Sequence, residues 1–346
     1  MKAAILVKQK EPLVLDEIDL PQELKYGQVL VKLAYSGICG SQLNEIDGEK
    51  GEDKFLPHLL GHEGSGIVEE CGDGVTIVKP GDHVVLHWRQ GLGIQSATPK
   101  YKWKDKTVNA GWVTTFNEYA VVSENRITKL SNDFDLKLAP LYGCAITTAY
   151  GVVHNDADLK TGESIAIFGS GGVGIALALA SKLVSAYPII AIDIKNKKLE
   201  QAKNFGATHT INSLEKNVEK EIFNLLPNGV DVVVDTTGIK QVRELSYELT
   251  SKEGRTIYVG VPKLGEKINI DSFPLHFTKR ITGSHGGNVN PSYDIPRLIR
   301  LQKSGNFSLD EMISHVYPLE QINEAINIVR EADNVVRCLI KMDNNI

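Results

Sequence analysis

The sequence predicts a two-domain α/β protein, in which a β-rich domain accompanies a doubly wound parallel sheet. Three observations support this prediction. The chain has 346 residues, which is more than one compact core usually holds. Up to about Phe134, short β-type runs alternate with Gly and Pro. From residue 165 to 260, apolar strands alternate with helical stretches, which is the pattern of a parallel sheet covered on both faces.

Five apolar runs predict strands in the first domain. They are separated by Gly, Pro and irregular polar segments, so we expect a mostly β domain with long loops. The runs are AAILV (3–7), QVLVKLAYSG (28–37), GSGIVEECG (64–72), DHVVLHW (82–88) and NEYAVV (117–122).

The second domain is predicted from four apolar strands and the helical stretches that separate them. The strands are SIAIFG (164–169), PIIAIDI (188–194), VDVVVD (230–235) and RTIYVGV (255–261). The helices are IALALASKLV (175–184), KKLEQAKNFG (197–206) and VRELSYELTS (242–251). After them we expect helices at 293–305 and 318–332 and a final strand at 335–342.

Composition restricts the class of function. The formal charge is −5, and no basic block appears, so we expect neither a nucleic-acid nor a membrane partner but a small-molecule substrate. The start resembles no signal peptide and no apolar run approaches a membrane span, so we expect a cytoplasmic protein. The four cysteines, Cys39, Cys71, Cys144 and Cys338, lie far apart, which favours metal or redox roles over a disulfide framework.

A glycine-rich turn predicts a dinucleotide site. Gly169, Gly171 and Gly174 follow a buried strand and open a helix, the context in which the backbone approaches a pyrophosphate at a helix N-terminus. Gly172 and Val173 complete the turn. The alternative is a glycine-rich turn in another doubly wound fold.

The next strand ends in Asp193, 19 residues after Gly174. A carboxylate there accepts hydrogen bonds from a ribose diol and repels a 2′-phosphate, which favours NAD. Lys195, Lys197 and Lys198 follow closely and partly offset this charge, so NADP stays open.

Cys39, His62 with Glu63, and Cys144 each lie in a Gly-flanked segment at the edge of an apolar run. Taken singly, such residues are more often buried or structural. Together, two thiolates and one imidazole are the ligands of a catalytic zinc that keeps a fourth position open. Glu63 can act beside the ligands or as a transient fourth ligand. Cys144 opens a predicted helix, whose N-terminus favours the thiolate.

These segments resemble a known family. G-I-C-G-S, G-H-E-x-x-G, G-C-x-x-x-T-x-Y-G and G-x-G-G-V-G occur in this order, as in the zinc-dependent alcohol dehydrogenases of the medium-chain dehydrogenase/reductase superfamily. The third motif is closest to the class III, formaldehyde-dehydrogenase-like branch. The resemblance implies a GroES-like catalytic domain at 1–147 and 290–346, a Rossmann NAD-binding domain at 148–289, and a homodimer.

The resemblance also implies individual roles. Cys39, His62 and Cys144 correspond to the ligands of one catalytic zinc, which acts as a Lewis acid, and Ser41 to the hydroxyl that accepts or returns the proton. The positions that correspond to NAD contacts are Thr148 near the nicotinamide, Asp193 and Lys198 at the adenosine ribose, Val261 in the carboxamide strand, and Arg337 at the pyrophosphate.

Three departures from the family pattern stand out. The segment from His87 to Trp112 contains no cysteine, so no structural zinc is expected there. Gln42 replaces the aspartate that orients the zinc-bound histidine, and Asn44 replaces the histidine that passes the proton outward. The exit route of the proton is therefore open, with His58, His87 and His285 as candidates.

Two rival functions follow from these observations. One is a zinc-free quinone or enone reductase of the same superfamily, which the set of Cys39, His62 and Cys144 argues against. The other is a non-catalytic nucleotide-binding protein, which the changes at Gln42 and Asn44 favour. For the enzyme, a polar wall at 87–89 suits a hydroxylated or anionic substrate such as a sugar derivative, unless these side chains only stabilise their loop.

Overall fold

The computed structural model describes residues 1–331 and 334–342. The chain divides into two compact units, one formed by Met1–Cys144 and Asn290–Ile346 and the other by Ala145–Val289. Each unit has its own sheets and its own buried apolar core.

The second unit contains a six-stranded sheet of order β13-β12-β11-β14-β15-β16, in which all neighbours are parallel. Counted along the chain this order is 3-2-1-4-5-6, the doubly wound arrangement of dinucleotide-binding folds. The strands are β11 (Ile165–Phe168), β12 (Ile189–Asp193), β13 (His209–Asn212), β14 (Val230–Asp235), β15 (Thr250–Tyr258) and β16 (Arg280–Gly283).

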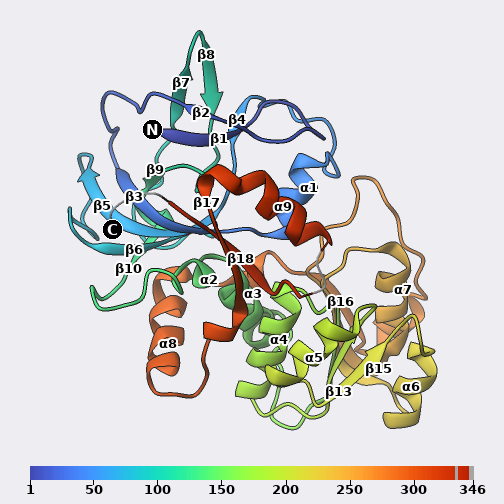
Figure 1. Ribbon diagram of the computed structural model, residues 1–346. Coiled ribbons are helices and arrows are strands. Elements are labelled where there is room, and N and C mark those ends of the chain that lie inside the picture. The colour runs from blue at the N-terminus through green and yellow to red at the C-terminus, as the bar shows by residue number, and fades with distance from the viewer. Residues whose placement is uncertain (332–333, 343–346) are drawn as a thin grey trace. The chain divides into compact units, whose positions relative to one another are not determined.

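Helices connect the first five of these strands, and one further helix precedes them (Figure 1). Within β11, Ala166 and Phe168 pack into the core that includes Val218 and Ile222 of α6. Ile165 and Ile167 are equally buried but point to the opposite face, because side chains alternate along a strand. Both faces are therefore covered. The helices are α3 (Ala145–Gly151), which continues as a π-helical turn at Val152–Asp156, α4 (Gly172–Leu183), α5 (Asn196–Asn204), α6 (Val218–Leu225) and α7 (Lys240–Leu249).

The first unit is built mainly from two sheets. The larger one has the order β10-β6-β5-β3-β18-β17, with β9 also paired to β3. The C-terminal strand β18 pairs with β3 from the start of the chain, so both ends of the sequence contribute to one sheet. The strands are β3 (Gln28–Gly37), β5 (Glu63–Cys71), β6 (His83–His87), β9 (Tyr119–Ser123), β10 (Ile127–Lys129), β17 (Ile313–Pro318) and β18 (Arg337–Lys341).

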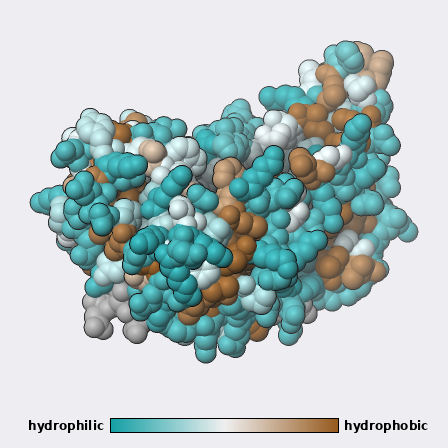
Figure 2. Space-filling model, turned by 90° about the horizontal axis from the view of Figure 1, so that it is seen from above, coloured by the Kyte–Doolittle hydropathy of each residue, from teal (hydrophilic) through white to brown (hydrophobic). Residues whose placement is uncertain are grey.

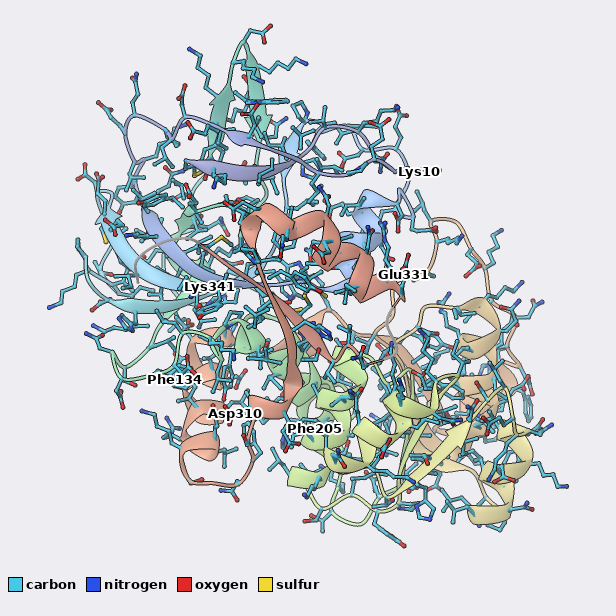
Figure 3. The ribbon with its side chains drawn as sticks, viewed as in Figure 1. Lys10, Phe134, Phe205, Asp310, Glu331 and Lys341 are labelled. Carbon is cyan, nitrogen blue, oxygen red and sulfur yellow. The ribbon has the colours of Figure 1, made fainter. Side chains whose placement is uncertain are left out.

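The smaller sheet of this unit has the order β2-β1-β4-β8-β7 and a separate core around Tyr101 and Trp103. Its strands are β1 (Lys2–Leu6), β2 (Val14–Glu17), β4 (His58–Leu59), β7 (Lys100–Trp103) and β8 (Lys106–Asn109). The helices of the unit are α1 (Gly40–Ile46), α2 (Pro140–Gly143), α8 (Pro291–Lys303) and α9 (Ile322–Glu331). Figure 3 marks the described end of α9 at Glu331 and the end of β18 at Lys341.

The predicted fold class is confirmed, because a β-rich unit accompanies a parallel doubly wound sheet. Among the observed elements, β13, α6, the β7–β8 hairpin and the short strands β2, β4, β10 and β17 were not predicted. The last residue of the predicted 318–332 helix, Ala332, lies outside the described residues. The face seen in Figure 2 is mostly hydrophilic, with hydrophobic residues in scattered groups. Within the described part of the chain, no helix combines the length and apolar character needed to cross a membrane.

Candidate active site

Three chain segments bring Cys39, His62 and Cys144 together in the first unit. Cys39 is the last residue before α1, His62 immediately precedes β5, and Cys144 lies between α2 and α3. One ligand atom from each, two sulfurs and a ring nitrogen, lie within 4.8 Å of one another. The cluster thus contains the donor set that suits a catalytic zinc.

Glycines allow the backbone to close around Glu63, the residue after His62. A Cβ atom at Gly37 would lie 2.5 Å from Glu63 Oε1. A Cβ atom at Gly143 would lie 2.5 Å from the carbonyl oxygen of Leu86 and 2.9 Å from Glu63 Cβ. Only glycine fits these two positions, which explains why both cysteines lie in glycine-flanked segments.

The surroundings of Cys39 favour its thiolate form. The pKa of this thiol is held well below its usual range, first because Cys144 donates a hydrogen bond to the sulfur. Burial opposes this effect, while His62 and Arg337 reinforce it. Because the thiolate is the form that binds metals, the site is prepared for a cation.

His62 presents a nitrogen for the same cation. Its Nε2 atom is buried and has no hydrogen-bond partner among the described residues. Its other ring nitrogen, Nδ1, contacts the side-chain amide of Gln42. A histidine that binds metal through Nε2 donates its Nδ1 hydrogen to an oxygen, a part that the Gln42 amide takes when its oxygen rather than its nitrogen faces the ring. The orphaned Nε2 atom and the sulfurs nearby fit a zinc ion.

The contact of Gln42 with His62 was not predicted from the sequence. We expected the orienting side chain to be lost, because a glutamine replaces the aspartate. The carboxylate is indeed absent, but the longer amide side chain still reaches the ring, and its Oε1 accepts the backbone N–H of Cys39 at 3.3 Å. The spacing of three residues from Cys39 to Gln42 at a helix start was the available signal.

A buried ion pair lies beside the cluster. The guanidinium of Arg337 on β18 contacts Glu63 Oε1, and both side chains are almost fully buried. Burial lowers the pKa of Arg337, while the nearby Cys39 sulfur raises it. The two partners are 274 residues apart, so no local pattern could reveal the pair. In the structure, Arg337 forms an ion pair with Glu63. The contact of Arg337 with a pyrophosphate stays a prediction.

Helix α1 also carries Ser41 and Asn44, both half-buried. Ser41 is two residues beyond Cys39 and is adjacent to Gln42, so the hydroxyl lies on the same short helix as the orienting amide. Thr148 is in the second unit, buried in α3.

The glycine turn in the second unit has the shape that a dinucleotide needs. Gly169 has φ +89°, in the region that favours glycine. A Cβ at Gly174 would overlap the carbonyl oxygen of Gly169, whereas one at Gly171 would meet nothing within 4 Å. Gly171 is the N-cap residue of α4, and Gly172 and Val173 form its first turn. The open space at Gly171 fits a phosphate held by the helix N-terminus.

Asp193 ends β12 beside this turn. Its carboxylate accepts the backbone N–H of Ser170 at 2.7 Å and that of Lys195 at 3.0 Å. The acid is therefore fixed at the edge where an adenosine ribose binds in such folds. Lys198 lies half-buried on α5, and Val261 is 56% exposed after β15.

A cavity of about 810 Å³ adjoins His62 and Gln42 in the first unit. Its polar and charged lining includes Glu45, Lys54, His58 and Lys100, and its aromatic lining Phe55 and Trp112. The wall expected at 87–89 is not part of this cavity. His87 is buried between the Arg89 carbonyl and the Thr128 hydroxyl, and burial lowers its pKa to about 4.

Comparisons with known proteins match both units. Residues 25–132 match the alcohol dehydrogenase GroES-like domain, and residues 172–304 match the zinc-binding dehydrogenase domain. The chain is 30% identical to S-(hydroxymethyl)glutathione dehydrogenase of Escherichia coli, over 96% of this chain and 98% of that protein. The chain belongs to the zinc-binding alcohol dehydrogenase family.

Solved structures of zinc-binding alcohol dehydrogenases have the same fold. An alcohol dehydrogenase zinc-binding domain protein from Burkholderia ambifaria has a TM-score of 0.90 and 29% identity. Benzyl alcohol dehydrogenase from Acinetobacter calcoaceticus has a TM-score of 0.89 and 29% identity. In each case the match covers 99% of both chains. Family membership confirms the predicted oxidoreductase class and the use of zinc and a nicotinamide cofactor.

The contact between Gln42 and His62 leads to a prediction for this zinc-binding alcohol dehydrogenase. Replacing Gln42 with leucine removes the group that fixes the ring, and we expect zinc affinity to fall roughly tenfold to a hundredfold. Competition with a chromophoric chelator measures this affinity. Glutamate at position 42 presents a carboxylate oxygen to the Nδ1 hydrogen and should retain tight binding. Equal zinc affinity in the leucine variant would contradict the role of the amide.

Proposed function

We propose that this chain transfers a hydride between an alcohol and NAD at a zinc ion held by Cys39, His62 and Cys144. The observation that carries the proposal is the convergence of these three side chains, from three separate segments, within 4.8 Å. Zinc bound there supplies Lewis acidity to a substrate oxygen. Neither rival, a zinc-free reductase or a non-catalytic nucleotide-binding protein, has a use for this donor set.

The residues around the cluster have distinct tasks in this proposal. Gln42 fixes the ring of His62, so that Nε2 stays aimed at the cation. The ion pair of Glu63 with Arg337 places a positive charge close to Cys39 and keeps the carboxylate next to the cluster. Ser41 accepts the proton of an alcohol during oxidation and returns it during reduction.

Cofactor binding is assigned to the turn Gly169–Gly174 and to the end of β12. The first-turn N–H groups of α4 bind the pyrophosphate, and the Asp193 carboxylate accepts the ribose hydroxyls. Thr148, Lys198, Val261 and Arg337 are the further cofactor contacts that the family resemblance implies. We assign residues 148–289 to the NAD-binding domain and 1–147 with 290–346 to the catalytic domain.

Replacing Asp193 with alanine should weaken NAD binding and reduce the preference for NAD over NADP. Loss of a charge-assisted hydrogen bond costs roughly 1.5–3 kcal/mol, or about tenfold to a hundredfold in the Michaelis constant for NAD. Steady-state kinetics with both cofactors measure the effect, and Asp193→Asn, which keeps an acceptor for the Ser170 N–H, is the control for turn geometry. A native preference of tenfold or more for NADP would show that Lys195 or Lys198 overrides the carboxylate.

The lining of the cavity beside His62 favours a hydroxylated or anionic alcohol. Lys54 and Lys100 are exposed, and neither forms an ion pair with any residue that the structure describes. Two free ammonium groups attract a carboxylate or phosphate on the substrate. The relatives named S-(hydroxymethyl)glutathione dehydrogenase suggest one such substrate, the adduct of formaldehyde with glutathione, as the second candidate beside sugar-like alcohols.

A substrate screen monitored by nicotinamide absorbance tests this assignment. It compares benzyl alcohol, polyols, sugar alcohols with and without a phosphate, and formaldehyde with glutathione. We expect the charged or hydroxylated substrates to have the higher kcat/KM, and Lys54→Gln with Lys100→Gln to reduce that advantage. A preference for benzyl alcohol that the double variant does not change would contradict the assignment.

We further propose a cytoplasmic homodimer. None of the four cysteines, all of which the structure describes, forms a disulfide, as is usual in a reducing compartment. The strand β16 forms one edge of the parallel sheet, and the segment before it exposes Phe273 and Phe277. An apolar surface next to a sheet edge is suited to pairing with a second copy.

A further inference from the structure

A second group of potential metal ligands lies in the first unit and is distinct from the cysteine cluster. It consists of Glu45 on α1, Asp53 in the following loop and His58 at the start of β4. One ligand atom from each residue lies within 4.8 Å of the other two. None of the three is a ligand of the cysteine cluster or part of the glycine turn, although Glu45 and His58 also line the cavity beside His62.

The two ring nitrogens of His58 have different contacts. Its Nδ1 atom lies 2.8 Å from the carbonyl oxygen of Leu59. A carbonyl only accepts hydrogen bonds, so Nδ1 donates to it and Nε2 is the ring nitrogen left for the group. Asp53 Oδ2, also an acceptor, lies 2.7 Å from this Nε2. Nε2 of His58 and Oδ2 of Asp53 therefore face the same point, where a metal cation would bind both.

The loop holds its carboxylate in place without using the oxygen that faces His58. Asp53 Oδ1 accepts the backbone N–H of Phe55 at 2.8 Å, which leaves Oδ2 for the site. The side chain of Gln9 accepts the backbone N–H of Asp53 at 3.3 Å and donates to the carbonyl of Gly51 at 3.0 Å. Gln9 also donates to the carbonyl of Glu45 at 3.4 Å. The ligands are thus positioned by residues outside the group.

Glu45 provides the third potential ligand of the group. Its Oε1 lies 3.9 Å from His58 Nε2, while its Oε2 is directed to Lys50 at 3.6 Å. Adjacent ligands of a tetrahedral ion with bonds of about 2.0 Å are roughly 3.3 Å apart. The separations of 2.7 and 3.9 Å from Nε2 to the two carboxylates lie on either side of this value.

We propose that Glu45, Asp53 and His58 bind a divalent transition-metal cation of the zinc type. The buried imidazole favours such a cation over magnesium or calcium, which prefer oxygen ligands. His58 is only 6% exposed, and both His58 and Glu45 line the cavity of about 810 Å³, which gives a cation and a bound water access. The bound cation links α1, the 47–57 loop and β4. Lacking thiolates, the site binds zinc more weakly than the cysteine cluster.

Titration of the holoenzyme, already loaded with one zinc per chain, with Zn²⁺ alone tests this proposal. Calorimetry should show one further equivalent bound to the wild type. Asp53→Asn, which keeps an oxygen for the Phe55 N–H, should bind that equivalent roughly a hundredfold more weakly. Glu52→Gln removes the same charge from the adjacent exposed residue and should bind it like the wild type.

Two further measurements keep the test decisive. If Asp53→Asn folds poorly in a melting experiment, Glu45→Gln replaces it, since the Glu45 side chain is one-third exposed. Co²⁺ as the second equivalent should give weak visible bands without thiolate charge transfer, which distinguishes this site from the cysteine cluster. If the wild type binds no second equivalent of zinc, His58 only forms a hydrogen bond with Asp53, and the proposal is wrong. Uptake that neither substitution weakens would also overturn the proposal.

Discussion

Serine in place of Cys39 is expected to abolish zinc binding and turnover while cofactor binding stays largely intact. A serine hydroxyl does not ionise near neutral pH, so the site loses one of its two anionic donors. The glycine turn and Asp193 belong to the second unit, which has its own core. Zinc analysis, nicotinamide absorbance and a fluorescence titration with NADH measure the three properties separately.

Cys71→Ser is the matched control for this experiment. Cys71 is a half-buried thiol of the same unit, but its sulfur donates to the carbonyl oxygen of Val78 and lies outside the cluster. This variant should keep both its zinc and its turnover. Full activity in a metal-free preparation of the wild type would contradict the account.

Alanine in place of Ser41 is expected to lower turnover on the order of a hundredfold. A positioned group that accepts or donates the reacting proton typically contributes this much. Ser41→Thr keeps a hydroxyl and should restore much of the rate, and zinc content should be the same in all three proteins. The pH profile of kcat is the readout that a purely structural role would leave unchanged.

The next step of the proton route is tested at Asn44, three residues further along α1. An amide has no titration near neutral pH and cannot act as the terminal base. We therefore expect Asn44→Ala to change turnover modestly and Asn44→His to raise it at low pH if proton exit limits the rate. His87 is unsuited to this task, since it is buried and its pKa is lowered to about 4. Undiminished turnover in Ser41→Ala would move the proton transfer to another group.

Much of the fold could be predicted because its strands are locally apolar. The run at 28–37 and the observed β3 coincide, and α4 begins only three residues earlier than predicted, at the glycine turn itself. The missed strand β13, HTIN, is short and has a single apolar residue, Ile211, since it lies at the edge of the sheet. The hairpin of β7 and β8 is rich in lysine, so its alternating pattern was inconspicuous.

Residue types in glycine-flanked motifs were sufficient to predict the three proposed zinc ligands. Cys39, His62 and Cys144 were chosen on that basis, and the structure brings them together. Such local patterns do not reveal contacts between segments that are distant in the sequence. The ion pair of Arg337 with Glu63 joins β18 to the start of β5, and the wall of the cavity beside His62 includes residues from 98–114 rather than 87–89. Both depend on how the strands pair, which local sequence does not encode.

The coordination of the first bound zinc tests the central claim most directly. X-ray absorption at the zinc edge, on protein carrying one equivalent of zinc, reports the number of sulfur and of nitrogen or oxygen ligands. We predict two sulfurs at about 2.3 Å and two lighter ligands at about 2.0–2.1 Å, one of them His62 and the other water or substrate. A zinc without sulfur ligands, or with sulfur ligands that persist unchanged in the Cys39→Ser protein, would contradict the assignment of Cys39, His62 and Cys144.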